Sequence, residues 1–411
     1  MSENILNEGY NKNSELFFKG VGENIVSKNS KYLDLSMCAG SILLGHNHKI
    51  FKKSIKKILK KNISNFAAPN IYARNFSKNI KKILPNTSSI IFCNSGTEAV
   101  TKSLRVARAI SNKNKVALVT GGWHGSVDQL LFRTGKNLKP IKLSSGLPLE
   151  SMKNVILIPY NNIEKTNQIL TKHKKNISCI IIEPIQGSLP YKDIKNYLKF
   201  LEKFAKKNNI ILIFDEMITG LRTDCSSVQN YYSIKPDIGV FGKSFGGGLP
   251  IGFITLSKKI KNKIDKMKIK VFFGGTFSGN PINMYVGNEV LKYIIVNKKK
   301  IFSKINNNAK FFTNSLNKFF LLKKLDLKIY RFKSMMRIVF TNHKLKDRYS
   351  RDFLERKKNK SIVSFKKYIK SQKIYLPSSG IIFFSYCHNR KHIKFLINKF
   401  KTGSLKYFNA K

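Results

Sequence analysis

Residues 238–255 read IGVFGKSFGGGLPIGFIT, and this stretch indicates what kind of sheet the chain forms. Two apolar runs, 238–241 and 251–255, flank a glycine-rich loop that carries Lys243. Short continuous apolar runs are typical of strands that are buried on both faces of a sheet. Glycine at this density marks backbone that bends tightly or comes close to a ligand. The stretch therefore predicts two buried strands with Lys243 held in the loop between them.

Five more apolar runs precede this stretch and alternate with amphipathic helical patterns such as 97–110 and 191–208. They are SIIFC (89–93), VALVT (116–120), VILI (155–158), CIIIE (179–183) and IILIF (210–214). This alternation predicts an α/β fold in which helices sandwich a mostly parallel sheet.

The rest of the chain has a different pattern. Residues 285–320 predict a lysine-rich helix, 325–340 and 380–387 predict strands, and 389–402 predict a helix. Near the start, KYLDLS (31–36) predicts a short strand. We therefore expect an N-terminal arm (1–50), a large domain (51–290) and a smaller α+β C-terminal domain (291–411).

The charge of the chain is strongly one-sided. Lys and Arg total 77 against 22 Asp and Glu, for a formal net charge of +55. One interpretation is a basic nucleic-acid-binding protein without catalytic activity. The other is a lysine-rich coding bias, which we favour because the lysines decorate helices along the whole chain without a nucleic-acid-binding motif. On this second interpretation we expect only loose, salt-sensitive attraction to nucleic acid.

Other function classes have little support in the sequence. The apolar runs are too short to cross a bilayer, and the N-terminus does not resemble a signal peptide, so we expect a cytoplasmic protein without membrane contact. The five cysteines are scattered without a CxxC pair, and no histidine cluster is completed by other ligands. We expect neither a disulfide framework nor a metal site.

Ligands of parallel α/β sheets bind at the carboxyl ends of the strands. Lys243 follows the strand at 238–241 in the sequence GKS, which suggests a phosphate-binding P-loop. That motif requires glycine at position 237, where this chain has Asp237, so the hypothesis fails. A solvated lysine is unusual between two buried strands. A desolvated lysine, by contrast, is a good amine nucleophile toward a carbonyl carbon.

Asp215 follows another apolar run, 210–214, and is expected to be partly buried. A buried carboxylate needs a cationic partner. Arg222, seven residues further on, is one candidate for that partner and would give Asp215 a structural role. The alternative is a partner on a ligand.

Two more strands end in residues with possible binding roles. After 89–93, Ser95, Gly96 and Thr97 begin a helix whose free amides suit a phosphate, although with Glu98 they also suit an ordinary capping box. After 116–120, Trp123 lies in the glycine-bounded sequence GGWHG. It could stack on a planar cofactor or close a loop over the core.

These parts together fit one chemistry. A lysine for a Schiff base, an aspartate to keep a pyridine nitrogen protonated, an aromatic ring to stack and a helix start for a phosphate describe a pyridoxal 5'-phosphate (PLP) site.

The motifs resemble those of the class III, fold type I PLP-dependent aminotransferases, and most closely the glutamate-1-semialdehyde 2,1-aminomutases among them. The resemblance covers about residues 18–400. It is carried by LLGHNHKI (43–50), NSGTEAVTKSLRVAR (94–108), GGWHGSVD (121–128), IIIEPIQG (180–187), LIFDEMITGLR (212–222), KPDIGVFGKSFGGGLPIGF (235–253), GGTFSGNP (274–281) and YLPSSGIIFFSYCH (375–388).

The resemblance implies a role for each matching residue. Lys243 would form the Schiff base and Asp215 would face the pyridine nitrogen. Trp123 would take the ring-stacking place, where the aminomutases usually have tyrosine, with His124 beside it. Ser95, Gly96 and Thr97 would hold the phosphate. Thr276 would reach the phosphate of a neighbouring subunit, which implies a homodimer with shared active sites. Glu183 and Glu216 match acids that line the site.

The chain departs from the aminomutase pattern where substrate recognition is expected. Ser188 replaces the usual asparagine, Ala73 replaces an acid, SKNS (27–30) replaces an acidic pattern, and the acid usual after YLP is missing. The resemblance thus implies PLP-dependent transamination of an amino acid or of a small metabolite bearing an amine or an aldehyde. The alternative is the aminomutase reaction, which forms 5-aminolevulinate for tetrapyrrole synthesis.

Overall fold

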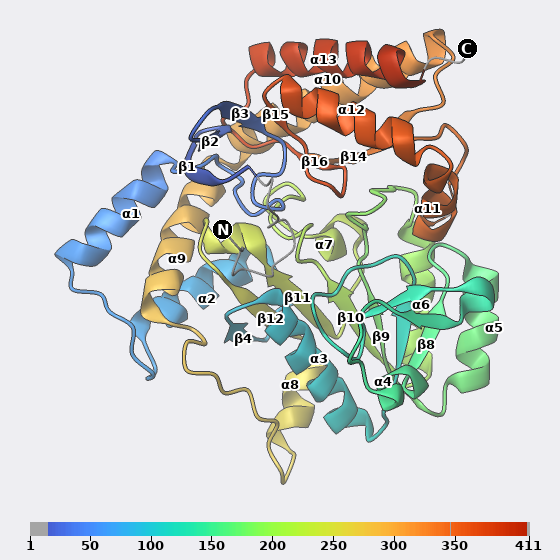
Figure 1. Cartoon of the computed structure of the whole chain (residues 1–411). Helices are drawn as coiled ribbons and strands as arrows, with labels where there is room; N and C mark the ends of the chain where they lie inside the picture. The colour runs from blue at the N-terminus through green and yellow to red at the C-terminus, as the bar shows by residue number, and fades with distance from the viewer. Residues whose placement is uncertain (1–14, 346, 409–411) are drawn as a thin grey trace.

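A seven-stranded sheet forms the centre of the computed structural model, which describes residues 15–345 and 347–408 (Figure 1). In spatial order its strands are β4 (Ser89–Cys93), β12 (Gly252–Leu256), β11 (Ile238–Gly242), β10 (Ile211–Asp215), β9 (Ile177–Ile182), β5 (Lys115–Val119) and β8 (Val155–Ile158). Only β12 runs antiparallel to its neighbours. The predicted α/β fold with a mostly parallel sheet is confirmed.

Helices cover both faces of this sheet because its strands bury side chains on both sides. Along β9, Ile180 and Ile182 lie in one apolar cluster, whereas Ile181 lies in another. The first cluster is closed by α5 (Ile163–His173), α6 (Lys195–Lys207) and α7 (Val228–Tyr232). The second is closed by α3 (Gly96–Ser111) and α8 (Lys258–Asp265). The short α4 (Leu149–Lys153) lies just before β8.

Three helices pack beside β4 and β12 and support the turn that carries Lys243. They are α1 (Lys49–Lys60), α2 (Ile71–Ile83) and α9 (Pro281–Val296). Helix α9 approaches the turn so closely that a Cβ at Gly287 would lie 2.8 Å from the carbonyl oxygen of Phe245. Phe245 itself is buried among Phe241 and Phe253. The backbone around Lys243 is therefore fixed from below by a packed aromatic cluster.

A second, antiparallel sheet is formed by β13 (Lys328–Phe332), β14 (Met335–Val339) and β16 (Ile381–Phe383). Helices α10 (Lys298–Leu322), α12 (Asn359–Ser371) and α13 (Arg390–Phe408) lie side by side over it (Figure 1). The stretch 285–320, predicted to be helical, is helical and is divided between two helices, because α9 ends at Val296 and α10 begins after Asn297.

The N-terminal strands join this C-terminal part of the molecule. Strands β1 (Phe17–Val21), β2 (Asn24–Ser27) and β3 (Lys31–Asp34) form a meander, and β15 (Ile374–Tyr375) pairs in parallel with β3. This pairing links the expected N-terminal arm to the expected C-terminal domain. The boundaries at 50 and 290 stay predictions.

Two smaller elements complete the region near the carboxyl ends of the central strands. A hairpin is formed by β6 (Phe132–Thr134) and β7 (Pro140–Lys142), and helix α11 (Arg348–Arg356) follows β14. Over the described ranges, no helix combines the length and the hydropathy that a bilayer crossing requires.

Candidate active site

Lys243 begins a single 3-10 turn, Lys243–Gly246, at the carboxyl end of β11. Its φ of 44° lies in the left-handed region, which costs a non-glycine residue on the order of 1 kcal/mol. The next residue fastens the turn, because the Ser244 hydroxyl donates to the carbonyl oxygen of Gly40 at 3.1 Å. Burial lowers the pKa of the Lys243 amine, although Glu183 and Asp215 act to raise it. The net effect lowers the pKa, so more of the amine is in the neutral, nucleophilic form than in a solvated lysine.

Asp215 ends the adjacent strand β10 and is 2% exposed. Its Oδ2 lies 2.8 Å from Nδ1 of His124, and its Oδ1 accepts a hydrogen bond from the Met217 amide at 3.1 Å. The partner of Asp215 within the protein is therefore His124. Nε2 of His124 is buried, and within the described ranges it has no hydrogen-bond partner.

The suggestion that Arg222 pairs with Asp215 is wrong. Arg222 is buried elsewhere and donates twice to the carbonyl oxygen of Gly40, at 2.9 and 2.7 Å. It also lies over the ring of Phe383. Arg222 thus ties the N-terminal loop to the C-terminal sheet and does not neutralise Asp215.

Glu183 follows β9 and holds the loop after β5 in place. Its Oε2 accepts from the Trp123 amide at 3.1 Å and its Oε1 from the Gly187 amide at 3.3 Å. Burial, followed by repulsion from Asp215, raises the pKa of Glu183 to about 7. The carboxyl group therefore changes charge near neutral pH while it fixes the backbone of Trp123.

Raised carboxyl pKa values have a consequence for stability. Glu183 has a pKa of about 7 in the folded protein against an ordinary 4.5, so folding favours its protonated form. The stability that this protonated carboxyl group contributes to the free energy of unfolding is fully present below about pH 4.5 and is lost as the pH rises through 7. We expect Glu183→Gln to flatten the decline in unfolding free energy over this window by at most about 3 kcal/mol.

The measurement is urea unfolding of the cofactor-free protein at a series of pH values. Glu216, whose pKa burial also raises to about 7, provides the matched comparison. Glu216→Gln should, on its own, also flatten the decline in the free energy of unfolding over the same pH window. An unchanged pH profile in Glu183→Gln would show that Glu183 ionises in the folded protein as readily as in the unfolded chain.

The start of α3 forms a backbone cradle. Ser95 is the N-cap, and its hydroxyl accepts from the Glu98 amide at 3.1 Å while Glu98 accepts from the Asn94 amide at 3.2 Å. The Ser95 half of the predicted capping box is thus formed, whereas the Glu98 carboxylate bonds the amide of the residue before the N-cap. This arrangement leaves the first helical amides, those of Gly96 and Thr97, without intrahelical partners and available to an anion. Gly252 allows this approach, because a Cβ there would overlap the carbonyl oxygen of Ser95.

The loop after β5 lies against this cradle. The Thr97 hydroxyl accepts from the Ser126 amide at 3.2 Å, and a Cβ at Gly125 would come within 2.5 Å of that hydroxyl. Trp123, in the same loop, is 54% exposed, so it does not close the loop over the core. Its ring is free to cover a ligand, whereas the neighbouring His124 is buried beneath the loop.

Two of the candidate residues lie elsewhere. Glu216 turns its carboxylate toward α7, where it accepts from the amides of Val228 and Gln229, so we leave it out of the proposed site. Thr276 is exposed in a loop that lines a hollow with Phe66 and Asn70, and Lys243 does not line that hollow.

Sequence reasoning missed the segment that faces Lys243 from the N-terminal side. Met37, Cys38 and Ala39 have successive φ values of 45°, 54° and 50°. Cys38 also raises the pKa of Lys243. Three non-glycine residues in the left-handed region are strained, and strain of this kind concentrates at functional sites. None of these residue types signals that conformation, so only the folded chain reveals it.

The residues present fit PLP on their own chemistry. A desolvated amine, a buried carboxylate on the next strand and free helix amides match an aldehyde, a pyridine nitrogen and a phosphate. Their arrangement at the carboxyl ends of β11, β10 and β4 defines a PLP-dependent enzyme of fold type I.

Comparison with known proteins gives the family. Residues 10–365 match the family described as Aminotransferase class-III. The chain belongs to this family, which is PLP-dependent, and the resemblance seen in the motifs is confirmed. Its similar proteins include the glutamate-1-semialdehyde 2,1-aminomutase of Wigglesworthia glossinidia brevipalpis, 36% identical over 324 residues that cover 76% of this chain and 72% of that protein. The aminomutase of Thermosipho africanus is 31% identical over 93% of this chain and 90% of that protein.

Solved structures show the same fold. An omega-transaminase from Sphaerobacter thermophilus superposes with a TM-score of 0.89 at 20% identity, covering 97% of this chain and 92% of that one. A glutamate-1-semialdehyde aminomutase from Pseudomonas aeruginosa PAO1 superposes with a TM-score of 0.86 at 15% identity, covering 96% and 88%. Transaminases and aminomutases thus share this architecture, so the fold alone does not choose between the two reactions.

Proposed function

We propose that this enzyme transfers an amino group between small metabolites with Lys243 as its catalytic lysine. The carrying observation is that Lys243 and Asp215 end adjacent parallel strands, β11 and β10, with the amine desolvated and the carboxylate buried. The ligands are a small-molecule amino donor and an amino acceptor. A basic nucleic-acid-binding protein without catalysis would have no need of this strained lysine.

When bound, PLP supplies an electron sink for the carbanion left when a substrate loses its Cα proton. Lys243 Nζ would hold the cofactor before the substrate amine displaces it. The free amine would then move the proton at the substrate Cα, a task for which its lowered pKa suits it.

Asp215 would hold a proton on the pyridine nitrogen through its negative charge. His124 positions that carboxylate through the 2.8 Å contact between its Nδ1 and Asp215 Oδ2. Trp123 would cover the ring and exclude water, and the Glu183 carboxylate would keep the Trp123 backbone in place. The amides of Gly96 and Thr97, with the Ser95 hydroxyl nearby, would bind the phosphate.

We also propose that the enzyme is a homodimer whose subunits share their sites. The supporting observation is that the Thr276 loop exposes large apolar side chains, Phe272 at 73% and Phe277 at 56%. Exposed apolar groups of this size mark interaction surfaces. In a dimer, this loop would bring Thr276 to the phosphate cradle of the partner.

The second candidate is the 1,2-amino shift that converts glutamate-1-semialdehyde into 5-aminolevulinate. The aminomutase relatives at 31–36% identity favour it. Against it stand the departures at Ser188, at Ala73 and after YLP (375–377).

Two measurements test the proposal. First, the purified protein with PLP should show a visible absorption band that borohydride abolishes, with the label on Lys243; a protein that takes up no PLP would refute the enzymatic function. Second, the PLP form is mixed with amino donors and the pyridoxamine form with glutamate-1-semialdehyde. Release of 5-aminolevulinate would establish the second candidate, and turnover of other donors without it would establish the first.

A further inference from the structure

The geometry points to a second binding subsite beside the candidate active site, for an anionic group attached to an aromatic or apolar part of the substrate. The subsite is a hollow of about 330 Å³ between the loop 121–125, the β6–β7 hairpin and helix α11. It shares Trp123 and His124 with the site of the proposed function, on which the inference rests. We call it the α11 hollow.

The walls of the α11 hollow are aromatic and apolar. Trp123, Tyr349 and Phe353 are exposed to 54%, 48% and 54% and line it together, with Ile141 and Leu143 of the hairpin region opposite. Large side chains left exposed around one concave surface are typical of a ligand site. Rings in this position can stack on a planar group or cover an apolar chain.

The charges in the α11 hollow favour an anion. Arg133, Arg348 and Arg356 line it, and the carboxylate present is that of Asp352. Asp352 is already engaged, because Arg348 Nε lies 3.3 Å from its Oδ2 and Arg351 donates to its Oδ1 at 3.0 Å. Within the part of the chain that the structure describes, neither Arg133 nor Arg356 has a carboxylate within 4.0 Å. The hollow therefore has an excess of positive charge.

The use of arginine distinguishes this region from the rest of the surface. Only eleven of the 77 basic residues of the chain are arginines. Five of these eleven, Arg133, Arg337, Arg348, Arg351 and Arg356, line the α11 hollow or support its helix. Arginine binds carboxylates and phosphates through two parallel hydrogen bonds and also stacks on rings, whereas lysine does neither as well. A general drift toward lysine does not account for this concentration.

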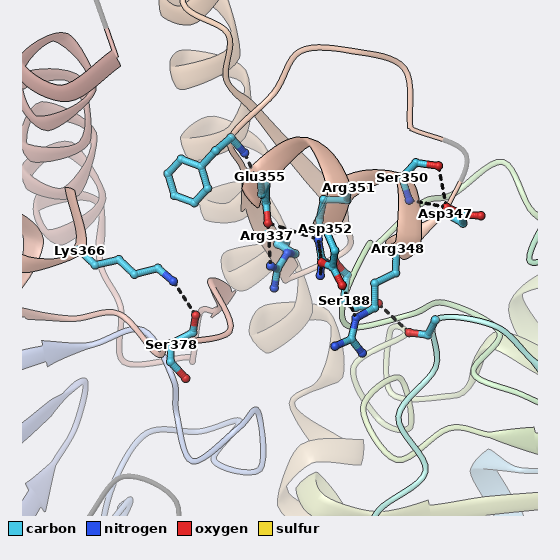
Figure 2. A network of polar contacts seen from close by, with 12 residues as sticks. Ser188, Arg337, Asp347, Arg348, Ser350, Arg351, Asp352, Glu355, Lys366 and Ser378 are labelled. Carbon is cyan, nitrogen blue, oxygen red and sulfur yellow. Dashed lines mark hydrogen bonds and ion pairs between the residues drawn. The ribbon is translucent and has the colours of Figure 1, made fainter. Parts of the chain in front are cut away.

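Helix α11, which covers the hollow and is called its roof below, is fixed by polar contacts to the rest of the molecule. Figure 2 shows Arg351 of α11 reaching Ser188, whose carbonyl oxygen it donates to, and Glu355 of α11 beside Arg337. Glu355 also accepts from the Phe340 amide at 3.1 Å, which ties α11 to the end of β14. The Ser188 hydroxyl donates to the carbonyl oxygen of Gly121 at 2.9 Å. Ser188 thus joins the roof of the hollow to the Trp123 loop.

These features define a class of substrate. One end carries the amine or carbonyl that reacts, and a planar or apolar segment connects it to a carboxylate or phosphate that the arginines bind. Ser188, one of the departures from the aminomutase pattern, bonds both α11 and the loop that carries Trp123.

The first test measures binding without turnover. Trp123 is the only tryptophan, so the intrinsic fluorescence of the full-length protein, with and without PLP, reports on the hollow directly. The probes are phenyl phosphate and benzoate, with inorganic phosphate as the charge alone and benzyl alcohol as the ring alone. We expect the aromatic anions to bind tightest, and the preferred one of the two identifies the anionic group.

Variants separate a built site from the attraction of a protein with a net charge of +55. Arg356→Gln and Arg133→Gln should each weaken binding of the aromatic anion about tenfold, the usual loss for one charge-assisted contact. Arg390→Gln removes the same charge on α13, where Arg390 packs on Phe311, and should change nothing. Equal losses in all three variants, or equal binding of inorganic phosphate and phenyl phosphate, would overturn the inference.

A kinetic test connects the hollow with catalysis. Aminoalkanoates of increasing chain length are compared with the matching alkylamines as amino donors. Arg356→Gln should raise KM for the aminoalkanoates of the best length about tenfold and leave the alkylamines unchanged. Aromatic anions that bind to a protein unable to take up PLP would refute the proposed function and keep the subsite. PLP-dependent turnover that Arg356→Gln does not affect would support the proposed function and refute the subsite.

Discussion

Lys243→Ala is expected to lower turnover by about a thousandfold or more and to leave PLP binding non-covalent. The amine at this position would both hold the cofactor and move the substrate proton, so its removal eliminates two functions at once. The protein should still fold, because alanine removes the buried amine and the Phe245 cluster beneath the turn stays intact. Turnover with saturating PLP, and mass spectrometry after borohydride treatment, measure the two effects.

The matched control is Lys206→Ala, which removes an exposed lysine from the last turn of α6, just before β10 begins. It should keep both activity and the borohydride label. Activity of Lys243→Ala close to that of the unaltered protein would rule out the catalytic role of Lys243. Lys243→Arg offers a second check, since it keeps a long basic side chain but cannot form the covalent link.

Asp215→Asn is expected to reduce turnover by about 10²–10⁴-fold. Asparagine keeps the shape of the side chain and an oxygen for the Met217 amide, so the fold is maintained while the negative charge is lost. Without that charge, a proton on the pyridine nitrogen is no longer favoured. Turnover at saturating PLP and the visible spectrum of the bound cofactor as a function of pH provide the measurement.

Asp237→Asn is the comparison for this substitution. Asp237 also accepts a hydrogen bond from the backbone of β10, from the Leu212 amide at 3.0 Å. It lies just before β11, however, at the amino ends of the parallel strands, whereas Asp215 lies at their carboxyl ends. It should affect stability without changing the spectrum of the cofactor. If Asp215→Asn and Asp237→Asn have the same effect on turnover, the role of Asp215 is structural.

The central sheet could be predicted from the sequence because its strands are buried on both faces. Runs such as 210–214 and 238–241 are apolar throughout, so each can be recognised as a buried strand without knowing which strand pairs with it. The break between α9 and α10 could not be seen in the same way, because Asn297 interrupts a helical pattern without proline or glycine. The pairing of β3 with β15 depends on contacts across most of the chain, which local patterns do not encode.

For the candidate site, sequence position at the strand ends predicted Lys243, Asp215 and the start of α3, and the structure places them at the carboxyl ends of β11, β10 and β4. Sequence position was not sufficient to choose partners. Arg222 is close to Asp215 in sequence, yet its side chain reaches Gly40, while His124 comes from another strand end to contact Asp215. Which side chains meet depends on the angle at which each loop leaves the sheet. A binding role for the arginines of α11 could not be predicted from the sequence for a related reason, because it depends on the folded hollow that they line.

The pairing of β3 with β15 also has a consequence for how the protein is made. Residues 31–34 leave the ribosome early, but their partner strand at 374–375 is synthesised some 340 residues later. At common rates of translation this interval lasts roughly 20–70 s. During that time the exposed edge of β3 has no native neighbour from the C-terminal part, although the central sheet can already form. We therefore expect the nascent chain to bind a chaperone that covers this edge of β3 until synthesis is nearly complete.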